Sequence, residues 1–304
     1  MRPSAAGALE RLVAEARWFH AIDFGGLVSK GRFGAEVPPN YTLYGVFELL
    51  GGLSLEGARA VDVGTMDGLV AFVMKALGAA EVIATDLAPR ETFEAARARL
   101  GLAIDYRVPL PVVELPGSLG ATGADVVVMA GVLYHVLDPL AVLQACRRSL
   151  RPGGFLLVET MYLFDEARPR LSFNPADTSA RGVEHANVFW RPSRRALEAM
   201  LGASGFDVLA SVAVDGRIAV LARARDGSRD GGERGDRGEP SPVRFHGAPG
   251  HRRIYPSLHR PRVPFQPAWK PRRTRDRLRH ARRSVWMHLQ AALAEAREVT
   301  RRAR

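Results

Sequence analysis

Residues 41–222 alternate short apolar runs of β type with stretches of helical periodicity. Because parallel strands need a crossover connection, usually a helix, this alternation is typical of βαβ units. We expect strands at 58–63, 81–86, 124–131, 155–160, 206–214 and 217–223, a weaker strand at 104–108, and helices at 67–77, 90–100, 138–150 and 193–203. The predicted fold is an α/β, doubly wound, Rossmann-like sheet.

Turn residues indicate how this sheet ends. Pro152-Gly153-Gly154 stops the helix at 138–150 and leads into the next strand. Asp215-Gly216 joins the last two strands, and Asp-Gly between two apolar runs is a strong hairpin signal. The sheet should therefore be parallel except for a closing antiparallel hairpin.

Three further segments flank the predicted domain at 41–222. Residues 1–40 are aromatic and contain glycine, and we expect them to form an N-terminal lid. Residues 223–242 are glycine-rich and charged, which indicates a flexible linker. Residues 243–304 begin with a proline- and arginine-rich stretch and end in an amphipathic helical pattern at 274–303. They are expected to form a basic, partly disordered tail.

The net charge of +11 is concentrated in this tail. The whole chain has 43 Lys and Arg against 32 Asp and Glu, and residues 243–304 hold 17 of the basic and 3 of the acidic residues, a net of +14. The other residues therefore carry 26 basic and 29 acidic groups, a net of −3. Charge thus bears on what the tail docks against, an anionic membrane surface or RNA phosphates, and not on the substrate of the domain.

Several classes of protein are disfavoured. The one cysteine, Cys146, cannot form an internal disulfide or a thiolate metal cluster, and the histidines show no metal-ligand spacing, so no metal is expected. The longest apolar stretch, 124–134, is shorter than the roughly 20 residues of a transmembrane helix, and the N-terminus lacks the apolar run of a signal peptide. We expect a cytoplasmic protein without a transmembrane segment.

The sequence DVGTMDG at 62–68 connects the first expected strand to a helix. In doubly wound folds a nucleotide-like ligand approaches this turn closely, and glycine leaves room for it. Asp86 ends the second strand 18 residues after Gly68, near the spacing at which an acidic side chain binds ribose hydroxyls. The candidate cofactor-binding residues are Asp62, Gly64, Thr65, Gly68, Asp86, Leu87 and Gly131.

Two types of cofactor compete for this turn. A dinucleotide places a pyrophosphate at the helix N-terminus, where Asp67 would repel it. S-Adenosylmethionine has no phosphate and carries a cationic sulfonium and an amino group, which suit acidic residues at Asp62 and Asp67. The closing hairpin also differs from the all-parallel sheet of dinucleotide-binding proteins. Both points favour S-adenosylmethionine over NAD.

Four motifs occur in order: DVGTMDG, ATD at 84–86, MAGVLYHVLDPL at 129–140 and LRPGGFLLVET at 150–160. In order and spacing, residues 60–222 resemble the class I S-adenosylmethionine-dependent methyltransferases. Met66 departs from that pattern, because it stands where these enzymes usually have the middle glycine of the turn. The resemblance implies S-adenosylmethionine as the cofactor and methyl transfer as the reaction.

A narrower resemblance rests on WFHAIDF at 18–24, SKGRF at 29–33, GVLYH at 131–135 and NVFWRPS at 187–193. These segments resemble the tRNA wobble-uridine carboxymethyltransferases. That resemblance implies that Lys30 and Tyr134 hold the carboxylate of a carboxylated S-adenosylmethionine. The family's third contact, a C-terminal arginine, has no secure match, and Arg217 is one candidate. We expect methyltransferase chemistry and leave the carboxylated cofactor as an alternative.

Methyl transfer is an in-line displacement, in which a hydroxyl nucleophile benefits from a general base. Ligands of such folds lie beyond the carboxyl ends of the strands, where Tyr134 and His135 follow the fourth strand. We take both as candidate catalytic residues, His135 as the base and Tyr134 as an aromatic wall for the sulfonium. The alternatives are that His135 caps the next helix and that Tyr134 is a packed aromatic residue.

Aromatic and polar side chains on either side of the core are candidates for substrate binding. They are Trp18, His20, Lys30, His185, Asn187 and Trp190. For the two tryptophans the alternative is hydrophobic packing of the flanking segments on the sheet.

Three functions remain open. The first is methyl transfer to a hydroxyl oxygen of a small-molecule or sugar acceptor, because the domain lacks an obvious basic groove. The second is modification of a tRNA wobble uridine, which Lys30 and the basic tail favour. The third is a non-catalytic scaffold that docks through its tail, which only Met66 suggests.

Overall fold

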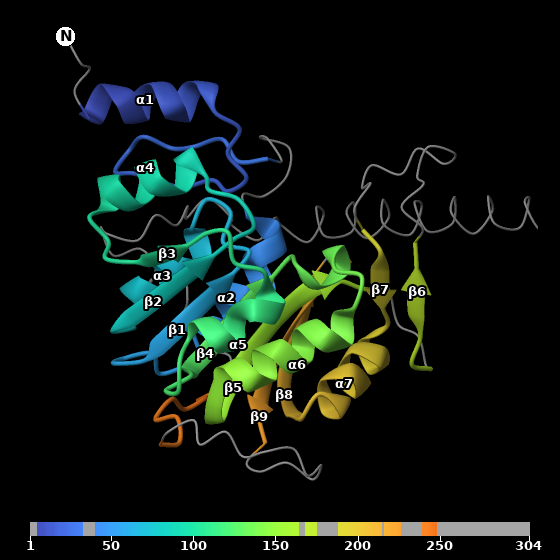
Figure 1. Cartoon of the computed structure of the whole chain (residues 1–304). Coiled ribbons are helices and arrows are strands. Elements are labelled where there is room, and N and C mark those ends of the chain that lie inside the picture. Colours follow the sequence, from blue (N-terminus) through green and yellow to red (C-terminus); the bar gives the residue numbers. More distant parts are fainter. Residues whose placement is uncertain are drawn as a thin grey trace, which may run out of the picture. The chain divides into compact units, whose positions relative to one another are not determined.

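The computed structural model describes residues 5–32, 40–163, 168–174, 188–214, 216–225 and 239–247. Seven strands form one sheet in the order β3-β2-β1-β4-β5-β9-β8 (Figure 1). Strands β1 to β5 pair in parallel, whereas β9 is antiparallel to both β5 and β8. The bounds are β1 Arg59–Val63, β2 Glu81–Thr85, β3 Asp105–Arg107, β4 Ala124–Ala130, β5 Leu150–Met161, β8 Phe206–Val214 and β9 Arg217–Ala224. The predicted doubly wound sheet with a closing hairpin is confirmed.

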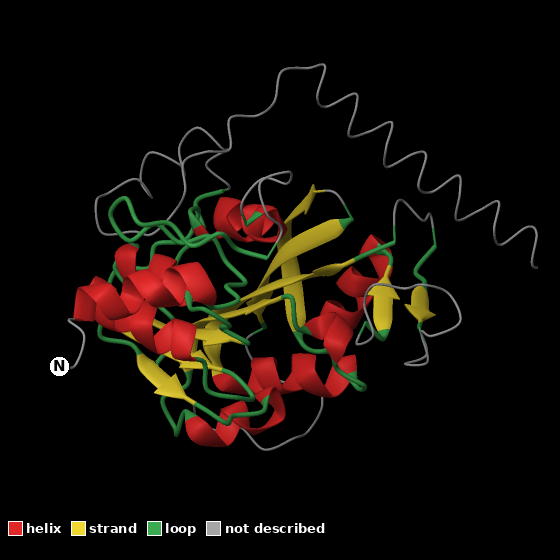
Figure 2. Cartoon of the chain, turned by 90° about the horizontal axis from the view of Figure 1, so that it is seen from above, coloured by secondary structure: helices red, strands yellow, loops and turns green. Residues whose placement is uncertain are grey.

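Helices cover both faces of this sheet, as the view from above shows (Figure 2). One core contains side chains of α1 Ala5–Glu15, α2 Tyr44–Leu50, α3 Leu69–Ala76 and α4 Glu91–Leu100. The other contains side chains of α5 Leu115–Ser118, α6 Pro139–Ser149 and α7 Arg194–Ala203. The four helices expected from the sequence correspond to α3, α4, α6 and α7.

Strand β4 shows why the central strands are continuous apolar runs in the sequence. Val126 and Val128 are buried in the first core, and Val127 and Met129 in the second. Successive side chains of a strand point to opposite faces, and here both faces are covered by helices. The five successive positions 126–130 therefore carry apolar side chains.

Some elements differ from the expectation. Strand β5 starts at Leu150 instead of 155, because Pro152-Gly153-Gly154 lies inside an irregular pairing that joins Ala124 to Leu150 and Val126 to Phe155. Gly153 has a φ of 68°, which allows the chain to bulge there without leaving β4. A separate two-stranded sheet, β6 Leu171–Phe173 and β7 Trp190–Pro192, was not expected from such short segments.

A segment at 239–247 packs on the domain across the boundary that the sequence suggested at 242. Val243 is only 2% exposed and joins the first core, and Phe245 packs against that core. Arg244 N–H donates to Ser54 Oγ at 2.9 Å, and Leu53 bridges to Phe245. The local composition of the tail could not show that these two apolar residues are buried.

The other predictions for the C-terminal part, most of the linker at 226–238 and the amphipathic pattern at 274–303, lie outside the described residues. Among the helices that the structure describes, none is long and apolar enough to cross a bilayer.

Candidate functional site

The carboxyl ends of β2, β1 and β4 lie side by side at one edge of the sheet. The register pairs Val63 with both Thr85 and Met129, so the residues that follow these positions leave the sheet together. The backbone N–H groups of Gly64 and Thr65 both donate to the carbonyl of Thr85 at 2.9 Å. A side chain at Gly64 would collide with Val132, because its Cβ would lie 2.5 Å from Cγ2. The three loops that carry the predicted cofactor residues are therefore adjacent.

The turn at 62–68 has left-handed backbone at three alternate residues. The φ angles are 71° at Gly64, 53° at Met66 and 92° at Gly68. Glycine adopts this region freely, whereas a residue with a side chain does so at a cost. Met66 keeps the conformation, and its N–H donates to Oδ2 of Asp86 at 3.1 Å. Met66 thus has a backbone conformation that glycine adopts freely.

Asp62 stabilises the turn through buried hydrogen bonds. Its carboxylate is buried, and Oδ2 accepts hydrogen bonds from Thr65 Oγ1 at 2.6 Å and from Ala71 N–H at 3.1 Å. Burial raises the pKa of Asp62 to about 7, although these two donors oppose the shift. Asp62 thus ties the turn to the start of α3, and its contact with a cationic cofactor stays a prediction.

Asp67 fastens the N-terminal segment to the same turn. The carboxylate is 1% exposed and accepts from the backbone N–H groups of Phe19 and His20, the latter at 2.8 Å, and from Thr92 Oγ1 at 2.7 Å. Three donors of the chain itself thus use this carboxylate, and one of them, the N–H of His20, lies 47 residues away in the sequence. Contact between Asp67 and a cationic cofactor stays a prediction.

Asp86 is the most accessible of the three carboxylates. Oδ2 accepts from Met66 N–H and lies 3.4 Å from Nε of Arg90, and Oδ1 accepts from the N–H of Leu87. A carboxylate has about four acceptor positions, and these three donors use three of them, so one remains for a ribose hydroxyl. Leu87 exposes most of its side chain beside it. Both predicted residues thus lie at the open edge of the sheet.

Tyr134 belongs to a buried polar cluster beyond the end of β4. Its hydroxyl lies 3.3 Å from an Nη of Arg217, whose guanidinium makes two bonds to Glu159, Nε–Oε1 at 2.6 Å and Nη2–Oε2 at 2.7 Å. A Cβ at Gly131 would lie 3.4 Å from the Tyr134 hydroxyl, so the cluster is next to the predicted cofactor glycine. The sequence analysis did not single out Glu159, although an acidic residue in the apolar run FLLVET indicates a buried charge.

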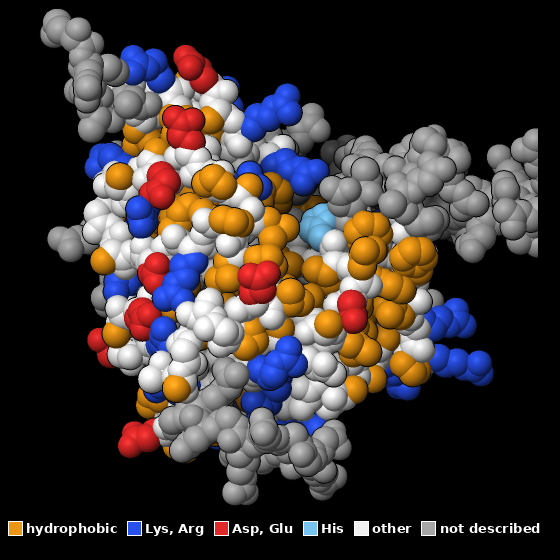
Figure 3. Space-filling model, viewed as in Figure 1, with side chains coloured by type: hydrophobic (Ala, Val, Ile, Leu, Met, Phe, Trp, Pro, Cys, Tyr) orange, Lys and Arg blue, Asp and Glu red, His pale blue; other side chains and the backbone are white. Residues whose placement is uncertain are grey.

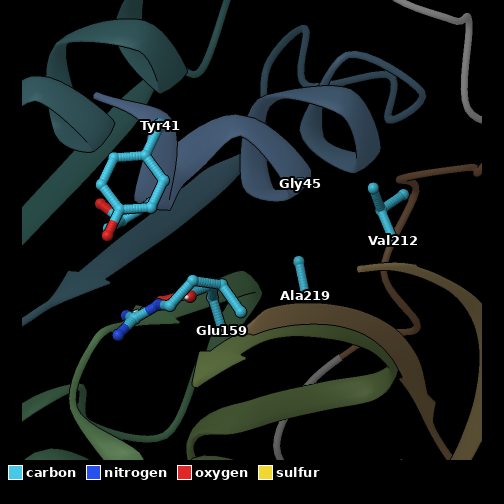
Figure 4. A pocket seen from close by; sticks show the side chains of 7 residues that line it. Tyr41, Gly45, Glu159, Val212 and Ala219 are labelled. Carbon is cyan, nitrogen blue, oxygen red and sulfur yellow. Dashed lines mark hydrogen bonds and ion pairs between the residues drawn. The ribbon is translucent and has the colours of Figure 1, made fainter. Parts of the chain in front are cut away.

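This cluster also borders a narrow hollow at the edge of the sheet. Figure 4 shows Tyr41 and Gly45 opposite Glu159, with Arg217 among the lining residues. Burial disfavours the charged guanidinium, but the carboxylate of Glu159 and the Tyr134 hydroxyl hold the pKa of Arg217 above its ordinary value. Arg217 therefore remains a cation in this setting.

His135 lies at the exposed end of a short 3₁₀ turn, Leu133–His135, and its ring centroid is 4.2 Å from that of Tyr134. The following helix, α6, is capped by Asp138, whose side chain accepts from Ala141 N–H at 2.9 Å. Asp138, not His135, is thus the N-cap. His135 is exposed beyond the end of β4.

The remaining substrate candidates lie in different places. Trp18 is buried in the first core, where it packs on Phe24 and donates to the carbonyl of Leu12 at 3.1 Å, and its contact with a substrate stays a prediction. Lys30 is exposed and lines a hollow with Val13, Trp18 and Arg32 that shares no residue with the one at Arg217. The backbone N–H of His20 donates to Asp67, which places His20 beside the turn at 62–68. His185 and Asn187 fall outside the described residues.

Apolar side chains are exposed close to His135. Leu137 is 72% exposed, and its carbonyl accepts from Trp190 Nε1 at 3.2 Å. The ring of Trp190 lies 4.7 Å from that of Phe173, which is 54% exposed. Figure 3 shows hydrophobic side chains gathered over α6 and beside β6 and β7. Trp190 is thereby placed near the acceptor end of the site.

Comparison with known proteins identifies the family. Residues 41–211, more than half of the chain, match the family model described as a methyltransferase domain. The chain belongs to this family. The resemblance to class I methyltransferases seen in the sequence is thereby confirmed, and the match covers strands β1 to β5, the turn at 62–68 and the residues beyond β4.

Curated relatives of this methyltransferase domain have different acceptors. A tRNA U34 carboxymethyltransferase of Chromohalobacter salexigens is 36% identical over 158 residues, 50% of this chain and 45% of the relative. Ubiquinone biosynthesis O-methyltransferases of Cereibacter sphaeroides and Xanthomonas campestris pv. campestris are 43% and 38% identical, over 36% and 47% of this chain and 43% and 61% of the relatives. The chain spans about half the length of these relatives.

Solved structures share the fold at low identity. The N-terminal domain of EvdMO1, determined in the presence of SAH and D-fucose, has a TM-score of 0.50 at 18% identity and covers 74% of this chain and 99% of that one. The [4+2]-cyclase SpnF has a TM-score of 0.51 at 15% identity and covers 73% and 93%. One fold thus carries different names and reactions, so the reaction must be argued from the site.

Proposed function

We propose that this chain is an S-adenosylmethionine-dependent methyltransferase that acts on a hydroxyl oxygen of a small-molecule or sugar acceptor. One observation carries the proposal: the left-handed turn at 62–68, Asp86 and Gly131 meet at the carboxyl ends of β1, β2 and β4, in a chain of the methyltransferase-domain family. Ligands of doubly wound folds bind at this edge.

The residues at this edge fit such a cofactor. Gly64 and Gly131 present bare backbone, and Asp86 has one acceptor position left for a ribose hydroxyl. When bound, S-adenosylmethionine supplies an electrophilic methyl group on a sulfonium. The aromatic ring of Tyr134, beyond Gly131, already faces one cation, because Cζ of Arg217 lies 4.9 Å from its centroid.

His135 is the candidate general base that takes the proton from the hydroxyl of the methyl acceptor. A neutral imidazole at the end of β4 takes the proton of the acceptor hydroxyl as the oxygen attacks, and neighbouring aromatic rings orient the acceptor. The exposed apolar surface of Leu137, Phe173 and Trp190 supports an acceptor with apolar parts. The names of the ubiquinone O-methyltransferases agree with a hydroxyl acceptor.

Isothermal titration with S-adenosylmethionine and with S-adenosylhomocysteine tests the cofactor. We expect binding of both by the folded chain, followed by turnover when hydroxylated aromatic compounds and sugars are supplied with labelled cofactor. A folded chain that binds neither nucleoside would contradict the proposal. Because Met66 has a backbone conformation that glycine adopts freely, the feature that suggested a non-catalytic scaffold is accounted for.

A second candidate function is transfer of a carboxymethyl group to a tRNA wobble uridine. The Tyr134–Arg217 contact supports it, because Arg217 was the uncertain third member of the carboxylate site and lies against the Tyr134 hydroxyl. The relative from Chromohalobacter salexigens carries this activity in its name. Two features weigh against it: Glu159 already pairs with Arg217, and Lys30 lines a different hollow.

The two candidates differ in cofactor preference. Carboxymethyl transfer requires tighter binding of carboxylated S-adenosylmethionine than of S-adenosylmethionine, and Tyr134→Phe should abolish that preference while it keeps the ring. Equal or weaker binding of the carboxylated form by the unmodified chain rejects the second candidate. Docking of the tail to tRNA or to an anionic membrane stays a prediction, tested by binding with and without residues 248–304.

A further inference from the structure

The imidazole of His20 is buried and incompletely paired. Only 5% of the residue is exposed, and Nδ1 has no hydrogen-bond partner among the residues that the structure describes. Buried polar atoms in folded proteins are nearly always paired, because an unpaired one loses its water without compensation. A ligand that donates a hydrogen bond to Nδ1 would complete the pairing.

The backbone of His20 is fixed to the cofactor turn. Its N–H donates to Oδ2 of Asp67 at 2.8 Å, and its carbonyl accepts from Ser29 Oγ at 2.9 Å. The neighbouring N–H of Phe19 donates to the same carboxylate. The ring is therefore carried by a rigid backbone that moves with the turn at 62–68.

Two charged side chains act on the ring of His20. They are Asp67, in the turn, and Arg90, whose Nε lies 3.4 Å from Oδ2 of Asp86. The ring also meets Phe19 edge-on at 5.1 Å. Burial lowers the pKa of His20 to about 4; Asp67 opposes the shift and Arg90 adds to it. The imidazole is thus neutral at pH 7 and keeps one nitrogen as an acceptor. It lies beside the turn, and Arg90 is the side chain that links its surroundings to Asp86.

We propose that His20 is a cofactor-binding residue whose imidazole accepts a hydrogen bond from a ribose hydroxyl of the nucleoside cofactor. Asp67 is then a positioning residue, since it holds the backbone of His20 and not the cofactor. The inference rests on the proposed function. It replaces the earlier expectation that His20 contacts the methyl acceptor.

Two substitutions separate a binding role from a structural one. His20→Leu removes the acceptor and fills the site with apolar atoms, so the ligand-free protein should unfold at the same or a higher temperature. Its affinity for S-adenosylhomocysteine should fall about tenfold, the loss expected for one hydrogen bond of about 1.4 kcal/mol. His20→Asn places an amide oxygen near the position of Nδ1 and should restore most of the affinity. His246→Leu, at an exposed histidine in the 239–247 segment, is the matched control and should change neither quantity.

Titrations with 5′-methylthioadenosine identify the group that is recognised, because this ligand keeps the ribose and lacks the amino acid part. A similar loss for both ligands in His20→Leu supports the ribose contact, and a loss for S-adenosylhomocysteine alone overturns it. In turnover assays KM for the cofactor should rise with kcat unchanged. Unchanged affinity, or a parallel fall of affinity and unfolding temperature, also contradicts the inference. Failure of the unmodified chain to bind either nucleoside would instead refute the proposed function.

Discussion

Three carboxylates lie in or beside the turn at 62–68, and burial separates their roles. Asp62 and Asp67 are buried and accept hydrogen bonds from the protein itself. Asp86 is more accessible and keeps one acceptor position. Because a buried carboxylate must be paired or protonated, the more exposed Asp86 is the one that we propose for the cofactor. Asp62 stabilises the turn, and Asp67 holds the N-terminal segment against it.

The buried carboxyl of Asp62 should make stability fall as pH rises. Its pKa is about 7 in the folded chain and 3.8 ordinarily, so between these values the folded state binds more protons than the unfolded state. The stabilisation is complete below pH 4 and is lost as pH rises through 7, on the order of 4 kcal/mol for a shift of this size. Urea unfolding at pH 5 and pH 8 should show a smaller difference in Asp62→Asn than in the unmodified chain.

The depressed pKa of His20 acts in the opposite sense, because its stabilisation is present above pH 6.5 and is lost as pH falls through 4. This contribution is common to both proteins and cancels when Asp62→Asn is compared with the unmodified chain at each pH. Identical pH dependence in the two would show that Asp62 does not titrate in this window.

His135 should affect turnover without affecting cofactor affinity. If it is the general base, His135→Asn lowers kcat by about 10²–10³ and removes the rise of kcat with pH near neutrality. Affinity for S-adenosylhomocysteine should stay within about twofold, because the exposed ring lies beyond the turn at 62–68. Stopped assays over pH 5–9 measure this, and a kcat within threefold of the unmodified enzyme would exclude the role.

The N-terminal segment is the element whose position matters most for the site. The segment from Trp18 to Ser29 is held by Asp67, by Asn40, which pairs with both backbone groups of Ala21, and by Ser29, which bonds to Ile22. These contacts support the proposal that it covers the cofactor site as a lid. Its attachment depends on a few polar contacts, so it should respond to single substitutions.

Asp67→Asn should loosen this segment while the sheet stays folded. An amide has one acceptor oxygen for the N–H groups of Phe19 and His20 and the hydroxyl of Thr92, and hydrogen bonds to a charged group contribute roughly 1.5–3 kcal/mol. Hydrogen exchange should increase over residues 18–30 and remain unchanged in β1 and β4. Asp207→Asn, at an exposed carboxylate paired with Arg225, is the control. Equal protection of the segment in both variants would show that Asp67 does not hold it.

At the scale of the whole molecule, the segment at 239–247 sets where the domain ends. Because Val243 and Phe245 pack on the first core, the tail cannot be removed at 242 without loss of buried surface. Two hydrogen bonds also hold this segment on the domain. Arg244 N–H donates to Ser54 Oγ, before β1, and Ser241 N–H donates to the carbonyl of Pro152, at the start of β5. A deletion that isolates the tail should start at residue 248.

Two truncations test this boundary. A chain that ends at 242 should lose about 2–4 kcal/mol of unfolding free energy, since it exposes the core around Val243 and Phe245. A chain that ends at 247 should unfold at the same urea concentration as the full chain. Val243→Ala in the full chain should reproduce part of the loss seen in the chain that ends at 242. Equal midpoints for the two truncations would remove the segment from the domain.

The sequence by itself determined the order of strands and helices, the closing hairpin and the turn at 62–68, with Asp86 beyond β2. These depend on short-range patterns: alternation along a strand, helical periodicity and turn chemistry at glycine and proline. The burial of the central strands on both faces can also be predicted from the sequence, because β4 is apolar at successive positions from 126 to 130.

Only the tertiary structure decided which polar groups meet. Asp67 and His20 are 47 residues apart, Tyr134 and Arg217 are 83 apart, and Ser54 and Arg244 are 190 apart. No local pattern records such pairs, since they form only when the chain brings distant loops to one edge of the sheet. The roles of Asp67, Glu159 and Val243 therefore depend on tertiary packing. A buried polar group must be paired with a partner inside the protein, and an apolar side chain is stabilised by removal from water.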